Sequence, residues 1–248
     1  MRVIPISFWG SEPNILKSSL QLWLDTGLRK SYTDPSSSWY NSINTSQVMT
    51  LANTPGFNNS NGGYLSFNGI DEYAYMSDLN GANSFTSNDN YSIESWTWIS
   101  STQNDTGTGD NMIIEKWNST NQSAYPYVMR WLRASSSIMF AAYNGSANPS
   151  CVFSAPTNTW VHTVGSFDHS NNLLTGYLNG TQANSTTMNL SGVTNTSVLS
   201  IGRRANLNNV SGTGYFTGRI AIIRIYNKSL SSDEVNRNFQ ANRSRFGV

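Results

Sequence analysis

The stretch YFTGRIAIIRIYNKSLSSDEV, residues 215–235, places a long apolar run directly before the start of a helix. Within it, the run Gly218–Tyr226 has apolar residues at most positions instead of a strict alternation with polar ones. A half-buried strand would alternate, whereas a short continuous apolar run is typical of a strand that is buried on both faces. The stretch therefore predicts a central strand with packed structure on both sides.

A helix is expected soon after this strand. Ser231 and Glu234 have the spacing of a capping box, in which the serine side chain caps a backbone N–H and the glutamate reaches back. Val235 and Phe239, four residues apart, fall on one helix face and are expected to pack on the sandwich. Gly247 is expected to end the helix.

Outward from this stretch, short runs with period-two alternation recur along the chain, separated by clusters of Gly, Asn, Ser and Pro. This pattern is typical of an all-β sandwich. The dipeptide Asn179-Gly180 predicts a hairpin, because both residues tolerate positive φ. The expected strands are Leu20–Leu24, Tyr64–Phe67, Tyr73–Met76, Tyr91–Ser100, Met112–Trp117, Tyr127–Arg133, Ile138–Tyr143, Trp160–Phe167, Leu173–Leu178, Ser197–Ile201 and Gly218–Tyr226.

The composition is that of one folded domain with few charges. The chain has 248 residues, of which 12% are charged and 12% aromatic, and a formal net charge of +1. Typical domains carry about 25% charged residues, and the balanced charge argues against nucleic-acid binding, which needs a basic surplus. No apolar run approaches the roughly 18 residues of a membrane span. The single cysteine excludes an internal disulfide framework. No linker interrupts the chain, so one domain is expected over residues 15–248.

Residues 1–14, MRVIPISFWGSEPN, are expected to form an N-terminal arm. Pro, Gly and polar residues interrupt the apolar stretch that an export signal needs, so we expect a chain that is used without export. Phe8 and Trp9 on this arm are expected to dock onto a partner chain. Packing of the arm on its own sandwich is the alternative.

Motifs spread over nearly the whole chain after the arm carry a family resemblance. They include LQLWLDTGLRKSY (20–32), PGFNNSNGGYLSFNGIDEYAYMSD (55–78), YSIESWTWI (91–99), WVHTVGSFD (160–168), LSIGRRA (199–205) and the stretch 215–235. In order and spacing they resemble the laminin-G-like, concanavalin A-like jelly roll. The resemblance implies two curved antiparallel sheets and a family of sugar-binding modules, adhesion modules and glycan-cleaving enzymes. A fold by itself does not assign one of these functions.

A finer resemblance involves the two ends and the centre of the chain. The LWLDTG start, the PGFNNSNGGYLSFNG centre and the NFQANRSRFGV end are similar to modules in structural proteins of marine tailed phages. This likeness implies a virion component: a capsid decoration, a fibre or an adhesin. The single cysteine and the expected lack of an export signal agree with assembly in the host cytoplasm.

Catalytic carboxylates are not expected. Hydrolases of this superfamily carry an E-x-D-x-x-E strand, whose carboxylates act as nucleophile and acid/base. Here Glu94 stands alone on its strand and Glu115 lies on another, so both are expected to be structural and the protein non-enzymatic. His162 is expected to be a packed strand residue, and Cys151 a buried small apolar group.

The turn FNGIDEY, residues 67–73, is similar to the turn through which many members of the family bind calcium. The resemblance implies Asn68 and Asp71 as ligands, and their oxygen atoms suit Ca²⁺. A further acid that often follows in the late strand is replaced here by Ala221, so one expected ligand is missing. The alternative is a tight turn in which Asn-Gly supplies a positive φ. No other cofactor is expected.

Sugar binding needs exposed aromatic rings together with Asn, Asp or Arg for the hydroxyl groups. Aromatic stripes on strands are expected to be core more often than a binding platform. The aromatic residues Trp39, Tyr40, Trp117 and Tyr125 are expected in loops, and they are the better candidates because a loop ring has less core to fill.

These observations leave three hypotheses about function. The leading one is a non-enzymatic jelly-roll protein on the virion surface, in contact with capsid or tail proteins and with sister subunits. Its contacts with host-surface glycans would be weak and multivalent. The second is a free, extracellular carbohydrate-binding lectin module, and the third is a polysaccharide hydrolase.

Overall fold

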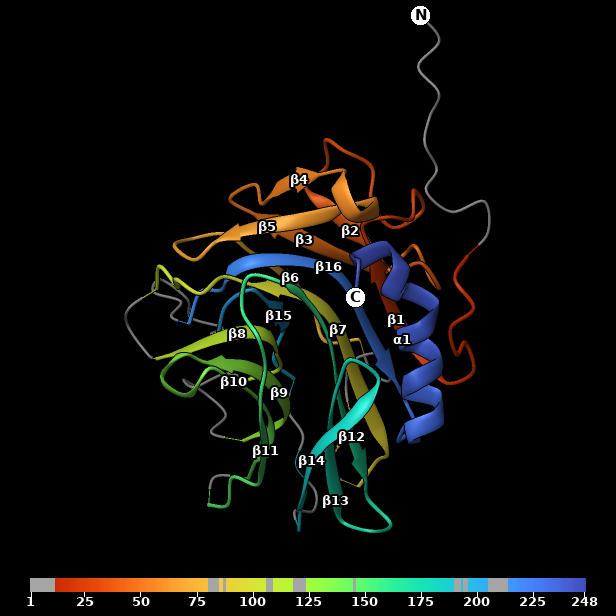
Figure 1. Ribbon diagram of the computed structural model, residues 1–248, viewed down its shortest axis with the longest axis vertical. Helices are drawn as coiled ribbons and strands as arrows, with labels where there is room; N and C mark the ends of the chain where they lie inside the picture. The colour runs from red at the N-terminus through yellow and green to blue at the C-terminus, as the bar shows by residue number, and fades with distance from the viewer. Residues whose placement is uncertain are drawn as a thin grey trace, which may run out of the picture.

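Two antiparallel sheets face each other across the main hydrophobic core (Figure 1). The computed structural model describes residues 12–79, 85–86, 88–105, 109–117, 124–144, 146–189, 193, 196–204 and 214–248. Within these residues each sheet has eight strands, and every strand pair is antiparallel. The predicted all-β jelly-roll sandwich with one C-terminal helix is confirmed.

The elements follow a simple order in each sheet. The first sheet runs β14 (Thr181–Thr187), β13 (Leu173–Leu178), β12 (Trp160–Asp168), β7 (Tyr91–Ile99), β16 (Thr217–Tyr226), β5 (Tyr64–Asn68) and β4 (Gly56–Asn58), and β1 (Leu20–Asp25) also pairs with β16. The second sheet runs β11 (Ser150–Ser154), β10 (Ser137–Tyr143), β9 (Tyr125–Leu132), β8 (Asp110–Glu115), β15 (Leu199–Ile201), β6 (Tyr73–Met76), β3 (Val48–Ala52) and β2 (Ser38–Tyr40). The helices are η1 (Ser60–Gly62), η2 (Arg133–Ser135) and α1 (Ser232–Phe246).

Strand β16 is the central strand that the sequence predicts. β7 pairs along one edge, while β5 and β1 follow one another along the other edge. Ile223 and Ile225 belong to the core between the sheets, whereas Ile222 and Tyr226 belong to a second core on the outer face of the first sheet. The apolar run is continuous because both faces of this strand are covered.

Helix α1 covers that outer face. The Ser231–Glu234 capping box is present, and Gly247 ends the helix with φ 72°. Val235 and Phe239 are buried as predicted, and the Phe239 ring stacks on Trp96 at 5.8 Å between centroids. The first sheet is thus covered on both faces. No helix of the described residues has the length and hydropathy that crossing a membrane requires.

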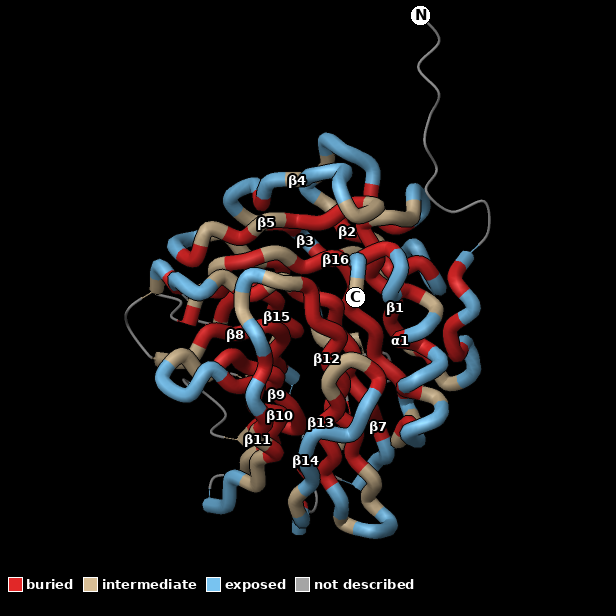
Figure 2. The backbone as a smooth tube through the Cα atoms, viewed as in Figure 1, coloured by how far each residue is buried: buried red, intermediate tan, exposed pale blue. Residues whose placement is uncertain are grey.

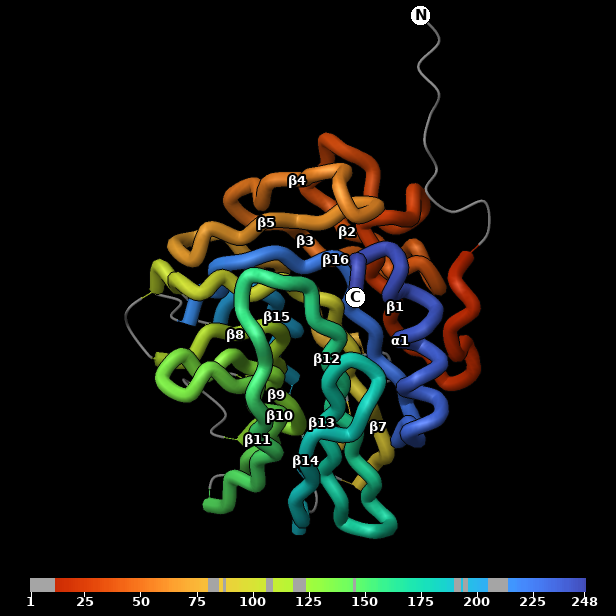
Figure 3. Tube along the Cα trace, viewed as in Figure 1, coloured from red at the N-terminus to blue at the C-terminus, as the bar shows by residue number. Residues whose placement is uncertain are grey.

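The beginning and the end of the described chain lie side by side. β1, red in Figure 3, pairs with β16, and the chain continues from β16 into α1, both blue. Most strands run through the buried interior in Figure 2, whereas the edge strand β14 is largely exposed. The N-terminal and C-terminal segments therefore build one end of the molecule together.

Every predicted strand exists, with ends displaced by two residues at most. The sequence did not reveal β2, β3, β4, β11 and β14. Strands β2 and β4 have three residues each, and β14 exposes six of its seven residues. These strands lack the alternation of buried and exposed residues that makes a strand recognisable.

Candidate functional site

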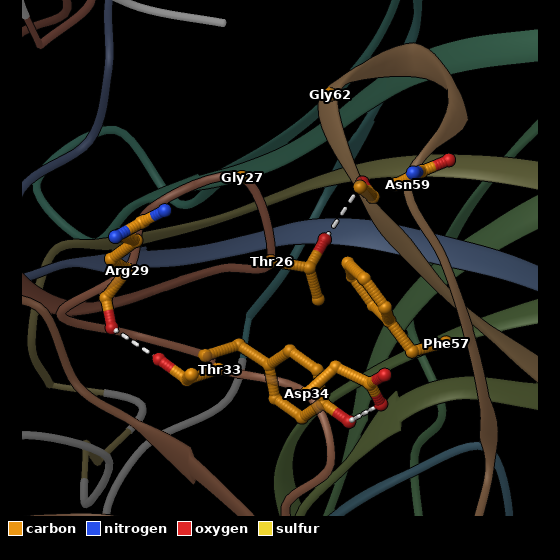
Figure 4. Close-up of a pocket in the computed structure, with 10 residues that line it drawn as sticks. Thr26, Gly27, Arg29, Thr33, Asp34, Phe57, Asn59 and Gly62 are labelled. Atoms are coloured by element: carbon orange, nitrogen blue, oxygen red, sulfur yellow. Dashed lines mark hydrogen bonds between the residues drawn. The ribbon is translucent and has the colours of Figure 1, made fainter. Parts of the chain in front are cut away.

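An open cleft lies beside the end of β1, between the loop that follows this strand and the segment that carries β4 and η1. Its volume is about 360 Å³. A second hollow of about 330 Å³ shares Tyr32, Asp34 and Phe57 with it. The lining residues of the larger hollow, hereafter the cleft, are Thr26, Gly27, Arg29, Tyr32, Thr33, Asp34, Phe57, Asn59, Gly62 and Gly63 (Figure 4).

Two aromatic rings form the apolar part of the cleft. Tyr32 and Phe57 lie 5.1 Å apart between ring centroids, with an angle of 38° between the rings. Tyr32 is buried and Phe57 is half-buried, so Phe57 presents the more accessible ring. Burial raises the pKa of Tyr32, and the nearby Asp34 carboxylate adds to this effect. Tyr32 therefore stays a neutral hydroxyl donor at ordinary pH.

Polar side chains line the rim. Arg29, Asp34 and Asn59 are exposed, and Arg29 and Asn59 lie on opposite sides of the opening in Figure 4. Within the part of the chain that the structure describes, the Arg29 guanidinium and the Asn59 side-chain amide have no hydrogen-bond partner, and Asp34 accepts one long bond of 3.4 Å from the Tyr32 hydroxyl. The rim therefore offers donors and acceptors to a ligand.

One wall of the cleft is held by the last turn of α1. The buried Arg245 donates to Asp25 Oδ1 at 2.7 Å and to the carbonyl oxygens of Asn61, Gly62 and Gly63 at 2.7, 3.2 and 2.8 Å. Asp25 Oδ1 also accepts a bond from the Gly27 backbone N–H at 2.9 Å. The same ion pair thus fixes both the end of β1 and the turn that closes the cleft.

Gly27 is required at this wall by close packing. A Cβ atom at this position would lie 2.5 Å from the Gly62 carbonyl oxygen and 2.9 Å from Arg245 Nη2. No side chain fits in that space. The LDTG segment and the C-terminal RSRF segment, 220 residues apart at Asp25 and Arg245, therefore meet in one structural unit.

The predicted sugar-binding residues are distributed differently. Trp39 is fully buried in the main core, so the expectation that it is an exposed loop ring is wrong. It lies in β2, which pairs with β3, and this pairing directs its ring inward. Tyr40 is also in β2 and is half-buried.

The other two candidates, Trp117 and Tyr125, are brought together on the second sheet. Their rings lie 5.6 Å apart in an edge-to-face arrangement. Trp117 is half-buried and follows β8. Tyr125 begins β9 instead of lying in a loop, is only 3% exposed, and donates to Asn148 Oδ1 at 3.0 Å. Neither residue lines the cleft.

The turn predicted to bind calcium is closed by its own hydrogen bonds. Asn68 Oδ1 accepts from the backbone N–H groups of Ile70, Asp71 and Glu72, and Asn68 Nδ2 donates to Asp71 Oδ1 at 2.8 Å. Gly69 has φ +71°. The described residues contain no group of three or more His, Cys, Asp or Glu side chains that could hold a metal ion. This donor set does not fit a calcium ion without loss of these bonds, and calcium binding stays a prediction.

The docking prediction for Phe8 and Trp9 lies outside the described residues. The described end of the arm contacts α1, because Arg237 donates to the Asn14 backbone carbonyl at 3.2 Å and to Asn14 Oδ1 at 2.8 Å. Cys151 is buried as expected, and burial raises the pKa of its thiol to about 11.

The strand glutamates are engaged in ion pairs. Glu94 accepts bonds from Arg224, Tyr226 and Asn238, and lies 3.1 Å from His162 Nε2. Burial alone raises the pKa of Glu94, but the Arg224 charge and the hydrogen bonds outweigh it and lower it to about 2. Glu115, also fully buried, lies 3.1 Å from Arg130 Nη2. The sequence did not reveal the cleft residues Tyr32 and Phe57, because neither has a motif and their loops meet only in the fold.

Comparison with known proteins agrees with the fold. A family model described as the concanavalin A-like lectin/glucanases superfamily matches residues 68–236. The binding domain of Paraclostridial Mosquitocidal Protein 1 is similar over 89% of this chain and 52% of its own, with 14% identity and a TM-score of 0.68. A comparison with curated proteins finds no match.

Two further solved structures are similar at low identity. The binding domain of Botulinum Neurotoxin DC, solved with SialylT, has a TM-score of 0.64 and 13% identity over 90% of this chain. The Trypanosoma rangeli sialidase, solved with sialic acid, has a TM-score of 0.65 and 14% identity over 94% of this chain. This chain spans 51% of the toxin domain and 35% of the sialidase. Such identities show a shared fold.

Proposed function

Since the chain belongs to the concanavalin A-like lectin/glucanases superfamily, we propose that it is a glycan-binding protein and that the cleft beside β1 holds the sugar. The observation that carries this proposal is the joint lining of the cleft by the Tyr32–Phe57 ring pair and by the exposed Arg29, Asp34 and Asn59. Binding sites for small ligands combine aromatic walls with a few polar groups that fix orientation.

The chemistry of the cleft suits a sugar ring. One face of a pyranose carries C–H groups, which can pack on the accessible Phe57 ring. The hydroxyl groups around the ring can donate to the Asp34 carboxylate and accept from Arg29 and the Asn59 amide. The opening is shallow, so a single site binds weakly and gains strength from several copies.

The proposal is one of binding without catalysis. The cleft contains one carboxylate, Asp34, whereas glycoside hydrolysis ordinarily uses a pair. The strand carboxylates Glu94 and Glu115 are fully buried beside arginines and do not line the cleft. Release of reducing ends from a polysaccharide panel by the purified protein would contradict this part of the proposal.

The cleft makes a direct prediction for two variants. We expect Asp34→Asn and Phe57→Leu each to weaken glycan binding by about tenfold, the equivalent of one charge-assisted hydrogen bond or one lost ring contact. A glycan array identifies the ligand, and titration calorimetry measures each variant. Asp233→Asn, an exposed acid on α1, is the matched control and should bind as the wild type does.

The same titrations test the calcium prediction for Asn68 and Asp71. They are run in calcium and in EDTA, with Asp71→Asn beside the wild type. Equal affinities in both buffers contradict a calcium requirement. Folded Asp34→Asn and Phe57→Leu proteins that bind at full strength contradict the cleft as the sugar site.

We further propose that the protein is displayed on a virion, as a capsid decoration or attachment protein. The support is the likeness of the LWLDTG, PGFNNSNGGYLSFNG and NFQANRSRFGV segments to phage structural modules. Two of these segments supply the Asp25–Arg245 pair beside the cleft, so the resembling parts belong to the glycan site. Capsid or tail proteins and sister subunits are the proposed partners, with Phe8 and Trp9 of the arm as their contact.

The virion proposal predicts recovery of the chain from particles. Purified particles are banded on a gradient, washed in high salt and analysed by mass spectrometry, and we expect many copies per particle. Absence of the chain from washed particles would contradict the virion role and leave a free, extracellular lectin module as the alternative.

A further inference from the structure

Three arginines stack on aromatic rings on the outer face of the second sheet. The guanidinium carbon of Arg203 lies 3.5 Å from the Tyr73 ring centroid, and that of Arg204 lies 4.5 Å from the Trp117 centroid. The guanidinium carbon of Arg130 lies 5.5 Å from Trp117 and 5.2 Å from the Tyr125 ring. We call this set, Arg130, Arg203, Arg204, Tyr73, Trp117 and Tyr125, the arginine face.

Two carboxylates lie among the three guanidinium groups. Glu115 is 3.1 Å from Arg130 Nη2 and 4.0 Å from Arg204 Nε, and Asp110 is 3.7 Å from Arg130 Nη1. Arg130 and Arg203 are each only 6% exposed. These five described side chains leave a surplus of one positive charge in a poorly solvated place, where an additional anion would be favourable.

Several donors of this face lack an acceptor. Among the described residues, Arg130 Nε, Arg203 Nε, Arg204 Nε and Trp117 Nε1 are buried and have no hydrogen-bond partner. Buried donors are normally satisfied, and a cluster of unsatisfied ones needs an explanation such as an ion, water or ligand. By contrast, the buried Arg245 donates four hydrogen bonds within the fold. The arginine face therefore differs from a purely structural arginine site.

The face continues to an exposed ring. Tyr75 in β6 is opposite Ser200 in β15, which is opposite Glu115 in β8. Two strand spacings separate Tyr75 from Glu115, or about 10 Å. Tyr75 is 37% exposed, and Trp117 is half-buried at the other side. A ligand made of successive rings can therefore contact aromatic surface at both places.

From this combination we infer that the arginine face is a second binding site, which takes the carboxylate or sulfate groups of an acidic polysaccharide. Guanidinium forks match planar and tetrahedral oxyanions, and such charge-assisted bonds are strong. Tyr75 and Trp117 supply ring surface for the sugars. Glu115 and Asp110 would repel a densely charged polyphosphate, so a polysaccharide fits better than a nucleic acid. The site is separate from the cleft, and neither depends on the other.

The test compares polymers that differ in charge and chemistry. Binding of the full chain to dextran sulfate, polygalacturonate, neutral dextran and oligo(dT) is measured by biolayer interferometry at two salt concentrations. The variants are Arg204→Met, Arg203→Met and Arg204→Lys. Arg219→Met is the matched control, because Arg219 also stacks on a ring, Trp98 at 4.3 Å, but on the first sheet. Asp34→Asn reports on the cleft.

We expect the wild type to bind at least one acidic polysaccharide more tightly than dextran, with weakening by salt. Arg204→Met and Arg203→Met should each lose about tenfold, the equivalent of one charge-assisted hydrogen bond. Arg204→Lys should lose less, because it keeps the charge without the fork. Arg219→Met and Asp34→Asn should bind as the wild type does.

Several results overturn the inference. One is equal binding of acidic and neutral polymers by the wild type, and another is tighter binding of oligo(dT) than of either acidic polysaccharide. Full-strength binding by folded Arg204→Met contradicts the site, and so does an equal loss in Arg219→Met, which would indicate unspecific attraction. If Arg203→Met does not fold, the Arg204 variants decide. Loss of neutral-glycan binding in Asp34→Asn alone concerns only the cleft.

Discussion

Replacement of Glu94 by Gln is expected to lower the free energy of unfolding by about 3–5 kcal/mol, the usual cost of removing one partner from a buried ion pair. Glu94 and Arg224 are both fully buried, with Arg224 Nη1 2.5 Å from Glu94 Oε1. Glutamine has nearly the same shape, so packing is kept while the carboxylate charge is lost. The guanidinium charge of Arg224 then lies in the interior without a compensating anion.

The network around Glu94 ties the first sheet to helix α1. Asn238 of the helix donates to Glu94 Oε2 at 2.8 Å and Tyr226 donates to the same oxygen at 3.1 Å. A second helix residue, Asn242, accepts from Arg224 Nη2 at 2.9 Å. The loss in Glu94→Gln should therefore include looser docking of the helix, and urea unfolding followed by tryptophan fluorescence measures it.

The pH dependence of unfolding provides a second readout. The pKa of Glu94 is lowered to about 2 from an ordinary value of 4.5. A lowered pKa in the folded state means that the charged group stabilises the fold above about pH 4.5, and that this contribution is lost as pH falls towards about 2. The difference between wild type and Glu94→Gln should be constant above this window and shrink within it.

Two controls separate the ion pair from general effects. Glu12→Gln removes an exposed acid that pairs with Lys17 and Lys30 at the surface, and such pairs contribute little. The double variant Glu94→Gln with Arg224→Met should recover part of the loss, because the unpaired charge is gone. A Glu94→Gln protein that unfolds at the wild-type urea concentration would contradict the assigned role of the pair.

The sequence predicts the sheet interior better than the edges. The apolar run of β16 and the alternation in β7 and β12 are dictated by cores on one or both faces, so they are visible in the residue pattern. The edge strand β14, TQANSTT, exposes nearly every residue and is held by backbone pairing with β13. Backbone hydrogen bonds leave no side-chain pattern, and such strands escape a sequence-based prediction.

The candidate site is less accessible to sequence reasoning for a similar reason. Trp39 was expected in a loop because its flanks are polar, but pairing of β2 with β3 places the ring in the core. Tyr32 and Phe57 lie 25 positions apart and face each other only after β1 and β4 take their places. Trp117 was selected correctly as an accessible ring, yet the arginines beside it come from three separate parts of the chain.

Arg245→Met is expected to destabilise the fold by about 3–5 kcal/mol and to weaken glycan binding in the cleft at the same time. The substitution leaves the Asp25 carboxylate, which is 1% exposed, without its guanidinium partner. It also removes the donor to the carbonyl oxygens of Asn61, Gly62 and Gly63. The turn that closes the cleft then loses its attachment to the end of α1.

Comparison with two further variants separates charge from geometry. Arg245→Lys keeps the charge but presents three donors from one nitrogen, so it cannot serve four acceptors and should recover only part of the stability. Arg243→Met is the matched control on the same helix, because Arg243 is exposed and donates only to the C-terminal Val248 carbonyl. Urea unfolding and calorimetric glycan titration are measured on all three.

The relation between the two readouts decides what Arg245 does. If it positions the cleft wall, Arg245→Met should bind the glycan less tightly even in dilute conditions where the protein is fully folded, and Arg245→Lys should be intermediate in both readouts. A destabilised Arg245→Met protein with unchanged glycan affinity would show that the wall keeps its shape without this residue. The structure favours the first outcome, because the same guanidinium contacts the turn, the end of β1 and, through Asp25, the backbone of Gly27.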